Sequence, residues 1–219
     1  MARELIKMAA DPPQRQNIPT WLRCLALLWL AVWIPTYWRA WGWPNFVHLC
    51  DVAVFLTCAG LWFNNALLLS SQAVSSIIVD LAWSLDVLWR LLFARHLIGG
   101  TEYLWDARVA LWIRLLSLFH IVWPFLLLWS IFRLGYDRRG WILQTGIAAA
   151  VLVASRFFGP SRNYNYAFTD PFFHRVWGPP ITHLAVVLAG LVVLDYLPTH
   201  FVLARFFSPP PAAGNQPAH

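Results

Sequence analysis

Charged residues are scarce in this sequence. Asp, Glu, Lys and Arg make up 12% of its 219 residues, whereas hydrophobic residues make up 59%. Since a soluble globular chain carries roughly 25% charged residues, we expect that water is not the main solvent of this protein. Cysteine is rare too: Cys24, Cys50 and Cys58 lie in apolar stretches without a CxxC pair. This spacing indicates neither a disulfide framework nor a zinc knuckle.

The positive charge of the chain does not point to a nucleic-acid partner. The net charge is +6, but the 16 basic residues are scattered along the ends of apolar runs and form no stripe. The 15 Trp residues also gather near the ends of these runs, as is typical of side chains at the headgroup level of a bilayer. The sequence has too few turn signals for a membrane β-barrel.

Six apolar runs, separated by Pro, Gly and charged residues, predict an all-α fold. A helix needs about 20 apolar residues to cross the hydrocarbon core, so we expect one polytopic bundle of about six transmembrane helices over residues 19–207. An N-terminal cytoplasmic segment (1–18) precedes the bundle, and a disordered Pro-rich tail (208–219) follows it. The predicted spans are 20–40, 46–63, 66–93, 110–133, 140–158 and 181–204.

Two expectations concern the ends and the length of the spans. Basic residues before the first span, and Arg138 and Arg139 after the fourth, predict that both termini are cytoplasmic, although other arginines fall on the opposite side. The third span would be about 42 Å long at the rise of an α-helix, so it must tilt, kink or project from the bilayer. Asp86 and Arg90 in its distal half are four residues apart and can pair on one face of the helix.

Polar side chains inside the spans carry the functional information, because each costs roughly 2.5 to 3.5 kcal/mol to insert and is usually paired or functional. Cys50 is either a small buried hydrophobe or a nucleophile that reacts as a thiolate. His120 either packs against a neighbouring helix or acts as a general base. Asp51 and Asp80 are either structural carboxyl groups or groups that orient an imidazole.

A metal or haem site is a further alternative. His48, His120 and His183 lie in or beside predicted spans and are of a type that binds iron or zinc. The sequence has no HxxxH or ExxH repeat of the kind found in membrane di-iron enzymes. We therefore expect no metal and no cofactor.

Three short blocks follow one another in a specific order: HLCD, LFHIVWPFLLLW and NYNYAFTDPFFHRVWGPP. Over about residues 45–185, the chain thereby resembles the YwaF-like bacterial membrane proteins and their eukaryotic relative, transmembrane protein 164. That relative moves acyl chains between phospholipids with a cysteine and a histidine, to which Cys50 and His120 correspond. Asp51 stands where the relative has another histidine, and NYNYAFTDP lacks a cysteine that the relative carries.

The resemblance implies a phospholipid acyltransferase or hydrolase in a bacterial cytoplasmic membrane, with Cys50 and His120 as the catalytic pair. We expect these two side chains to converge on a lipid-accessible cavity, capped by an ordered segment from Gly159 to Pro180. A non-enzymatic transporter or binding protein is the alternative, and a haem- or metal-binding redox protein is the third possibility. The expected supporting residues are His48 and Asp51 for orientation, Asn163 and Asn165 for the oxyanion, and Arg156, Arg162 and Arg175 for the lipid phosphate.

Overall fold

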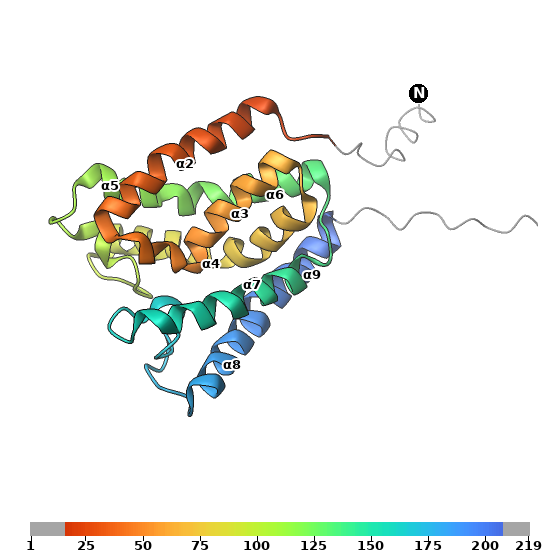
Figure 1. The fold of residues 1–219 in the computed structure, drawn as a ribbon. Helices are drawn as coiled ribbons and strands as arrows, with labels where there is room; N and C mark the ends of the chain where they lie inside the picture. The colour runs from red at the N-terminus through yellow and green to blue at the C-terminus, as the bar shows by residue number, and fades with distance from the viewer. Residues whose placement is uncertain (1–15, 208–219) are drawn as a thin grey trace, which may run out of the picture.

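The computed structural model describes residues 16–207, and this part of the chain is helical without strands (Figure 1). The prediction of an all-α bundle is confirmed. The main helices are α2 (Thr20–Trp41), α3 (Leu49–Phe63), α4 (Ala66–Phe93), α5 (Leu111–Leu115), α6 (Phe119–Leu134), α7 (Gly140–Ser155), α8 (Pro180–Leu191) and α9 (Leu197–Phe207). Short helical turns join them: η1 (Trp43–Val47), η2 (Glu102–Trp105), η3 (Leu116–Leu118), η4 (Arg156–Phe158), η5 (Tyr164–Tyr166) and the π-helix η6 (Val192–Tyr196).

The chain is an integral membrane protein. Five helical stretches are long and apolar enough to cross a bilayer, and α3 is a shorter apolar helix of 15 residues. Three of the five are composite, since α5 to α6, α7 to η4 and α8 to α9 each run on without a break. The predicted second span began at residue 46, but α3 begins at Leu49 because η1 and the extended residue His48 precede it. The predicted tail lies outside the described residues.

Helix α4 is the centre of the bundle. It packs against α3, α6, α7 and α9, and its buried face includes Ser70, Ser71, Ala73, Ser75 and Ser76. Small residues allow the backbones of membrane helices to approach closely. Helix α2 lies along one side of the bundle, while α8 extends away from it at the other side (Figure 1).

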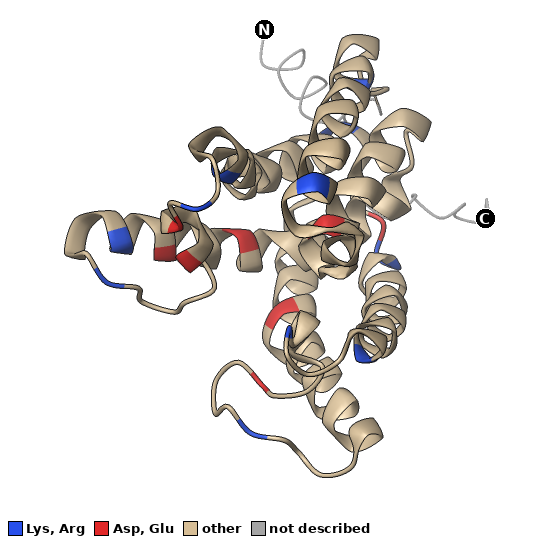
Figure 2. Cartoon of the chain, turned by 60° about the vertical axis from the view of Figure 1, so that its left-hand side comes forward, with Lys and Arg blue, Asp and Glu red and all other residues tan. Residues whose placement is uncertain are grey.

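Both described ends of the chain form hydrogen bonds with the C-terminal end of α6 or with the turn that follows it. The backbone N–H of Gln16 donates to the carbonyl of Arg133 at 3.0 Å, and the N–H of Tyr136 donates to the carbonyl of Phe207 at 3.1 Å. The two ends therefore lie on one face of the bundle, but basic residues flank both faces (Figure 2). The cytoplasmic location of this face stays a prediction. Described basic residues on the other face are Arg39, Arg90, Arg95, Arg108, Arg114, Arg156, Arg162 and Arg175.

The predicted pair of Asp86 with Arg90 is wrong. The carboxylate of Asp86 accepts hydrogen bonds from the backbone N–H groups of residues 97–99, and it also binds His96 and Thr101. Arg90 instead places its guanidinium 5.6 Å from the ring centroid of Trp105. Backbone donors that a turn already holds in place bind the carboxylate at little cost in entropy, whereas pairing would immobilise a long arginine side chain.

Candidate functional site

A buried carboxyl and imidazole pair joins the two central helices. Asp80 on α4 and His120 on α6 are 2% and 6% exposed, and Asp80 Oδ1 lies 2.6 Å from His120 Nδ1. The imidazole ring stacks between Phe119 and Trp83, with centroid separations of 4.2 and 4.7 Å. The expectation that an aspartate orients an imidazole thus finds a specific partner, Asp80. Both helices and both rings hold the orientation of His120.

The free nitrogen of His120 decides what this pair can do. A carboxylate beside Nδ1 favours the tautomer with its proton on Nδ1, which leaves Nε2 as an acceptor. Within residues 16–207, Nε2 makes no hydrogen bond. An imidazole oriented by a carboxylate, with its second nitrogen uncommitted, has the arrangement of a general base.

Cys50 lies in the first turn of α3, on the face of the bundle opposite the chain ends, and is half-buried. Its Sγ is 3.9 Å from Oδ1 of the buried Asp51, a weak contact. The other carboxyl oxygen of Asp51 accepts a 2.7 Å hydrogen bond from the side-chain amide of Asn45. Asp51 is therefore held by η1 and α3, close to the helix N-terminus where negative charge is favourable.

Few direct contacts link the side chains expected at the site within the described residues. Burial lowers the pKa of the His48 imidazole to about 4, and the positive charge of Arg162 acts in the same direction. Within the described residues, no hydrogen bond links Cys50 with His120. The pair would have to close this gap when a substrate binds.

Asn165 fastens the segment from Gly159 to Pro180 to the start of α3. Its amide nitrogen donates to the carbonyl of Val47 at 2.7 Å and to Ser155 Oγ at 2.8 Å. Its amide oxygen accepts from the backbone N–H of Leu49 at 2.8 Å. The segment thus packs next to the turn that carries Cys50, as expected for a cap over this region.

Asn163 stabilises the same segment through hydrogen bonds to backbone groups inside it. Its amide oxygen accepts from the N–H groups of Phe168 and Thr169, and its amide nitrogen donates to the carbonyl of Thr169. Asn163 and Asn165 both have positive φ angles, 41° and 51°, a conformation that asparagine tolerates better than most residues. The amide nitrogen of Asn165 already donates two hydrogen bonds, so Asn165 would have to break a native contact to stabilise an oxyanion, whereas Asn163 donates only one.

The three arginines expected to hold a lipid phosphate differ in their surroundings. Arg156 donates to the carbonyl of Ala167 at 2.9 Å and lies 4.0 Å above the ring of Phe168, so it stabilises the segment. Arg162 and Arg175 are exposed. Of these, Arg162 lowers the pKa of the His48 imidazole by its positive charge.

His183 does not join the other histidines. Its Nε2 lies 3.0 Å from the carbonyl of Tyr166, and its Nδ1 accepts from the N–H of Trp177 at 3.2 Å. The described residues contain no group of three His, Cys, Asp or Glu side chains that could hold a metal ion.

Sequence reasoning missed a second group of buried polar side chains, which hydrogen bonds link to one another. Gln144 on α7 donates to Ser75 at 2.8 Å and to Tyr196 at 3.4 Å, and it accepts from Gln72 at 3.3 Å. Next to Tyr196, the buried Asp195 has one carboxyl oxygen without a hydrogen-bond partner in the described part of the chain, as does Asp80. Two glutamines inside apolar runs were the signal that could have revealed this chain.

The comparisons with known proteins do not assign this chain to a family. No family model, no curated protein and no solved structure matches it. The resemblance to YwaF-like membrane proteins therefore stays a prediction from three sequence blocks.

Proposed function

We propose that this protein transfers or hydrolyses the acyl chain of a phospholipid ester, with Cys50 as the nucleophile and His120 as the general base. One observation supports the proposal above the others: the 2.6 Å contact between Asp80 and His120, which leaves Nε2 free. A purely structural histidine at this depth would be expected to engage both nitrogens, as His183 does.

The proposed reaction has two steps. First, His120 Nε2 takes the thiol proton of Cys50, and the thiolate attacks the ester carbonyl. The ester C–O bond breaks, and the leaving alkoxide takes the proton from His120 to give a lysophospholipid and a thioester on Cys50. Second, a hydroxyl group of water or of a lysophospholipid gives its proton to His120 and attacks the thioester carbonyl. The C–S bond breaks and the proton on His120 returns to the sulfur, which restores the thiol of Cys50. The product is a fatty acid or a phospholipid.

The position of Cys50 suits an ester substrate. It lies in the first turn of α3, directly after η1 and the extended residue His48, and exposed Trp43 lies at the same end. Tryptophan of this kind marks the headgroup level, just above the depth of a phospholipid ester. Asp51 and His48 would position the thiol from either side.

The decisive experiment measures acyl transfer by the purified full-length protein in nanodiscs that contain a phospholipid with a fluorescent acyl chain. Release of a fluorescent fatty acid reports hydrolysis, and added lysophospholipid reports transfer. We expect Cys50→Ala and His120→Gln to abolish turnover, and the wild-type protein to carry a thioester on the peptide with Cys50. The matched control is Cys24→Ala, since Cys24 is exposed on α2 away from the site. Full turnover by Cys50→Ala would refute the proposal.

A transporter is the second candidate, and the buried, hydrogen-bonded polar side chains around Gln144 favour it. Asp80 and Asp195, with unpartnered oxygens inside the bundle, resemble the carboxyl groups of proton relays. Proteoliposomes with an internal pH indicator test this function. Proton flux that Asp195→Asn removes, without any acyl turnover, would favour the transporter over the acyltransferase.

A further inference from the structure

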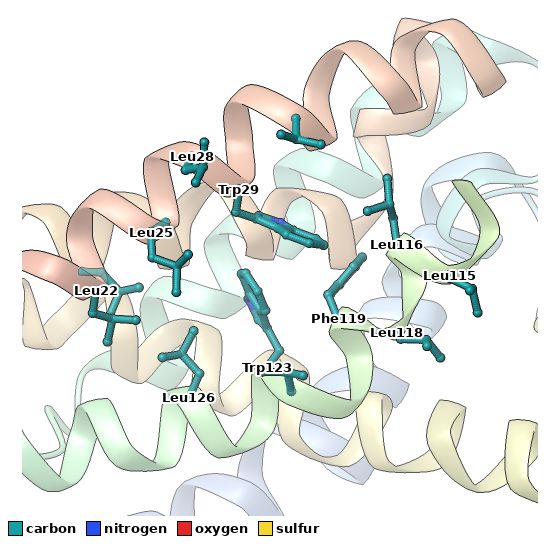
Figure 3. A pocket seen from close by; sticks show the side chains of 14 residues that line it. Leu22, Leu25, Leu28, Trp29, Leu115, Leu116, Leu118, Phe119, Trp123 and Leu126 are labelled. Carbon is teal, nitrogen blue, oxygen red and sulfur yellow. The ribbon is translucent and has the colours of Figure 1, made fainter. Parts of the chain in front are cut away.

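An apolar groove of about 510 Å³ runs between α2 and the α5 to α6 helix. Buried Leu61, Phe119 and Trp123 form its floor, and exposed Leu28 and Val122 stand at its rims. Figure 3 shows the rings of Trp29, Phe119 and Trp123 meeting between the two helices. The full lining is Leu22, Leu25, Ala26, Leu28, Trp29, Val32, Leu61, Leu115, Leu116, Leu118, Phe119, Val122, Trp123 and Leu126.

The groove lies at the depth of the acyl chains. Its α2 wall begins at Val32, about 10 Å along the helix from Arg39, and extends about 15 Å further to Leu22. It therefore crosses the middle of the roughly 30 Å hydrocarbon core. Every residue that lines the groove is apolar apart from the indole nitrogens, so a hydrocarbon chain is the occupant that fits its chemistry.

The basic side chain of Arg39 lies beyond the Val32 end of this groove. The lining residues of α2 recur at helical spacing, and the same stripe continues from Val32 to Thr36 and Arg39. Arg39 is exposed and forms no ion pair or hydrogen bond within residues 16–207. Exposed Trp38 and Trp112 lie at the same end of the two helices, where tryptophan marks the headgroup level.

We propose that the groove binds a phospholipid, with one acyl chain that enters the groove past Val32 and the phosphate on Arg39. An arginine binds phosphate oxygens with charge-assisted hydrogen bonds. The groove ends beside the candidate site, because Phe119 lines it while stacking on His120. Binding of this lipid does not depend on chemistry at Cys50, so the proposal goes beyond the proposed function.

The test uses phosphatidylglycerol with a photoreactive diazirine near the end of one acyl chain, in nanodiscs with the full-length protein. After irradiation, mass spectrometry of peptides locates the labelled residues. We expect labelling of groove residues several-fold above that of Leu27 and Phe201, which are exposed outside the groove. Equal labelling of groove and outer residues would overturn the proposal.

Substitutions that fill the groove provide the second arm. Val32→Trp on α2 and Val122→Trp on α6 should each reduce groove labelling several-fold. The matched controls, Leu27→Trp and Ile121→Trp, add the same bulk to exposed positions that do not line the groove and should leave labelling unchanged. Unreduced labelling in both groove variants, each eluting as a monodisperse sample, would contradict the proposal.

The phosphate contact has its own readout. Arg39→Gln should lower labelling by the photoreactive phosphatidylglycerol towards the level given by a photoreactive diacylglycerol, which lacks the phosphate. Arg205→Gln, an exposed arginine on the opposite face, is the control. Undiminished labelling by phosphatidylglycerol in Arg39→Gln would refute the proposed contact between Arg39 and the lipid phosphate. Repeating the labelling in Cys50→Ala separates the two proposals, because lipid binding should persist there while acyl turnover is lost.

Discussion

Gly140, the first residue of α7, lies at a close approach of α7 to α4, and its replacement by alanine should be costly. A Cβ atom at this position would lie 2.9 Å from both the carbonyl carbon and the Cβ of Ser70, and 3.0 Å from the backbone nitrogen of Ser71. Favourable carbon contacts begin at about 3.5 Å. Since two of these three atoms belong to the backbone of α4, no rotamer change relieves the clash.

The expected cost follows from this geometry. Overpacking of this kind costs about 1 to 3 kcal/mol, because α7 must move away from α4. The movement would also stretch the 2.9 Å hydrogen bond from the N–H of Asp137 to Ser70 Oγ. Gly146, on the same helix, is the matched control, because its added Cβ meets no atom within 4 Å. There, alanine should stabilise the helix by about 0.5 to 1 kcal/mol.

The assay is reversible unfolding in mixed micelles with increasing SDS, followed by far-UV circular dichroism. Gly140→Ala should unfold at a lower SDS fraction than the wild type, and Gly146→Ala at the same or a higher fraction. The free energies of unfolding of the two variants should differ by about 1.5 to 4 kcal/mol. Equal midpoints for the two variants would refute the close approach of α7 to α4.

Three further predictions concern the candidate site. Asp80→Asn keeps the shape of the side chain but replaces the carboxylate by a neutral amide that no longer favours a proton on His120 Nδ1, so acyl turnover should fall at least about 100-fold, with a shifted pH profile and an intact fold; unchanged turnover would contradict the role of Asp80. The pKa of His48 is about 4 in the folded protein against 6.5 normally, so the unfolded chain binds more protons as the pH falls from 6.5 to 4. Unfolding titrations should therefore show stability that is full above pH 6.5 and falls across this window, by up to about 3 kcal/mol, and His48→Asn should flatten the dependence. Asn165→Gly retains the positive φ but removes three hydrogen bonds, so hydrogen exchange in residues 159–180 should accelerate, whereas exchange in α4 should not change.

The helices could be predicted from the sequence because their signal is local. Each apolar run is bounded by Pro, Gly or charged residues, and the structure ends α4 at Ala94, whose φ of 56° is left-handed, directly after the predicted end of the third span. The start of α3 could not be placed as well. Its position depends on η1 and on Asn165, which lies 116 residues away from Leu49 in the sequence.

The partners of the buried polar groups were harder to predict. The sequence singled out Asp80 and His120 separately, but their contact joins residues 40 apart and depends on how α4 packs on α6. Asp86 was assigned to the neighbour at helical spacing, yet it binds the turn that follows α4. The amides of Asn163 and Asn165 were expected to face a substrate, and instead they satisfy backbone groups that the irregular segment exposes.

The fastening of both described ends to one turn has a consequence for the order of assembly. The carbonyl of Arg133 can be met as soon as α6 is made, because Gln16 is already present. The N–H of Tyr136, in contrast, finds its acceptor only when synthesis has reached Phe207. Until α9 inserts, this turn keeps an open donor, and Gln144 lacks its bond to Tyr196. The last helix therefore locks the earlier ones together, and a nascent chain that stops short of Phe207 should be cleared by quality-control proteases faster than the whole one.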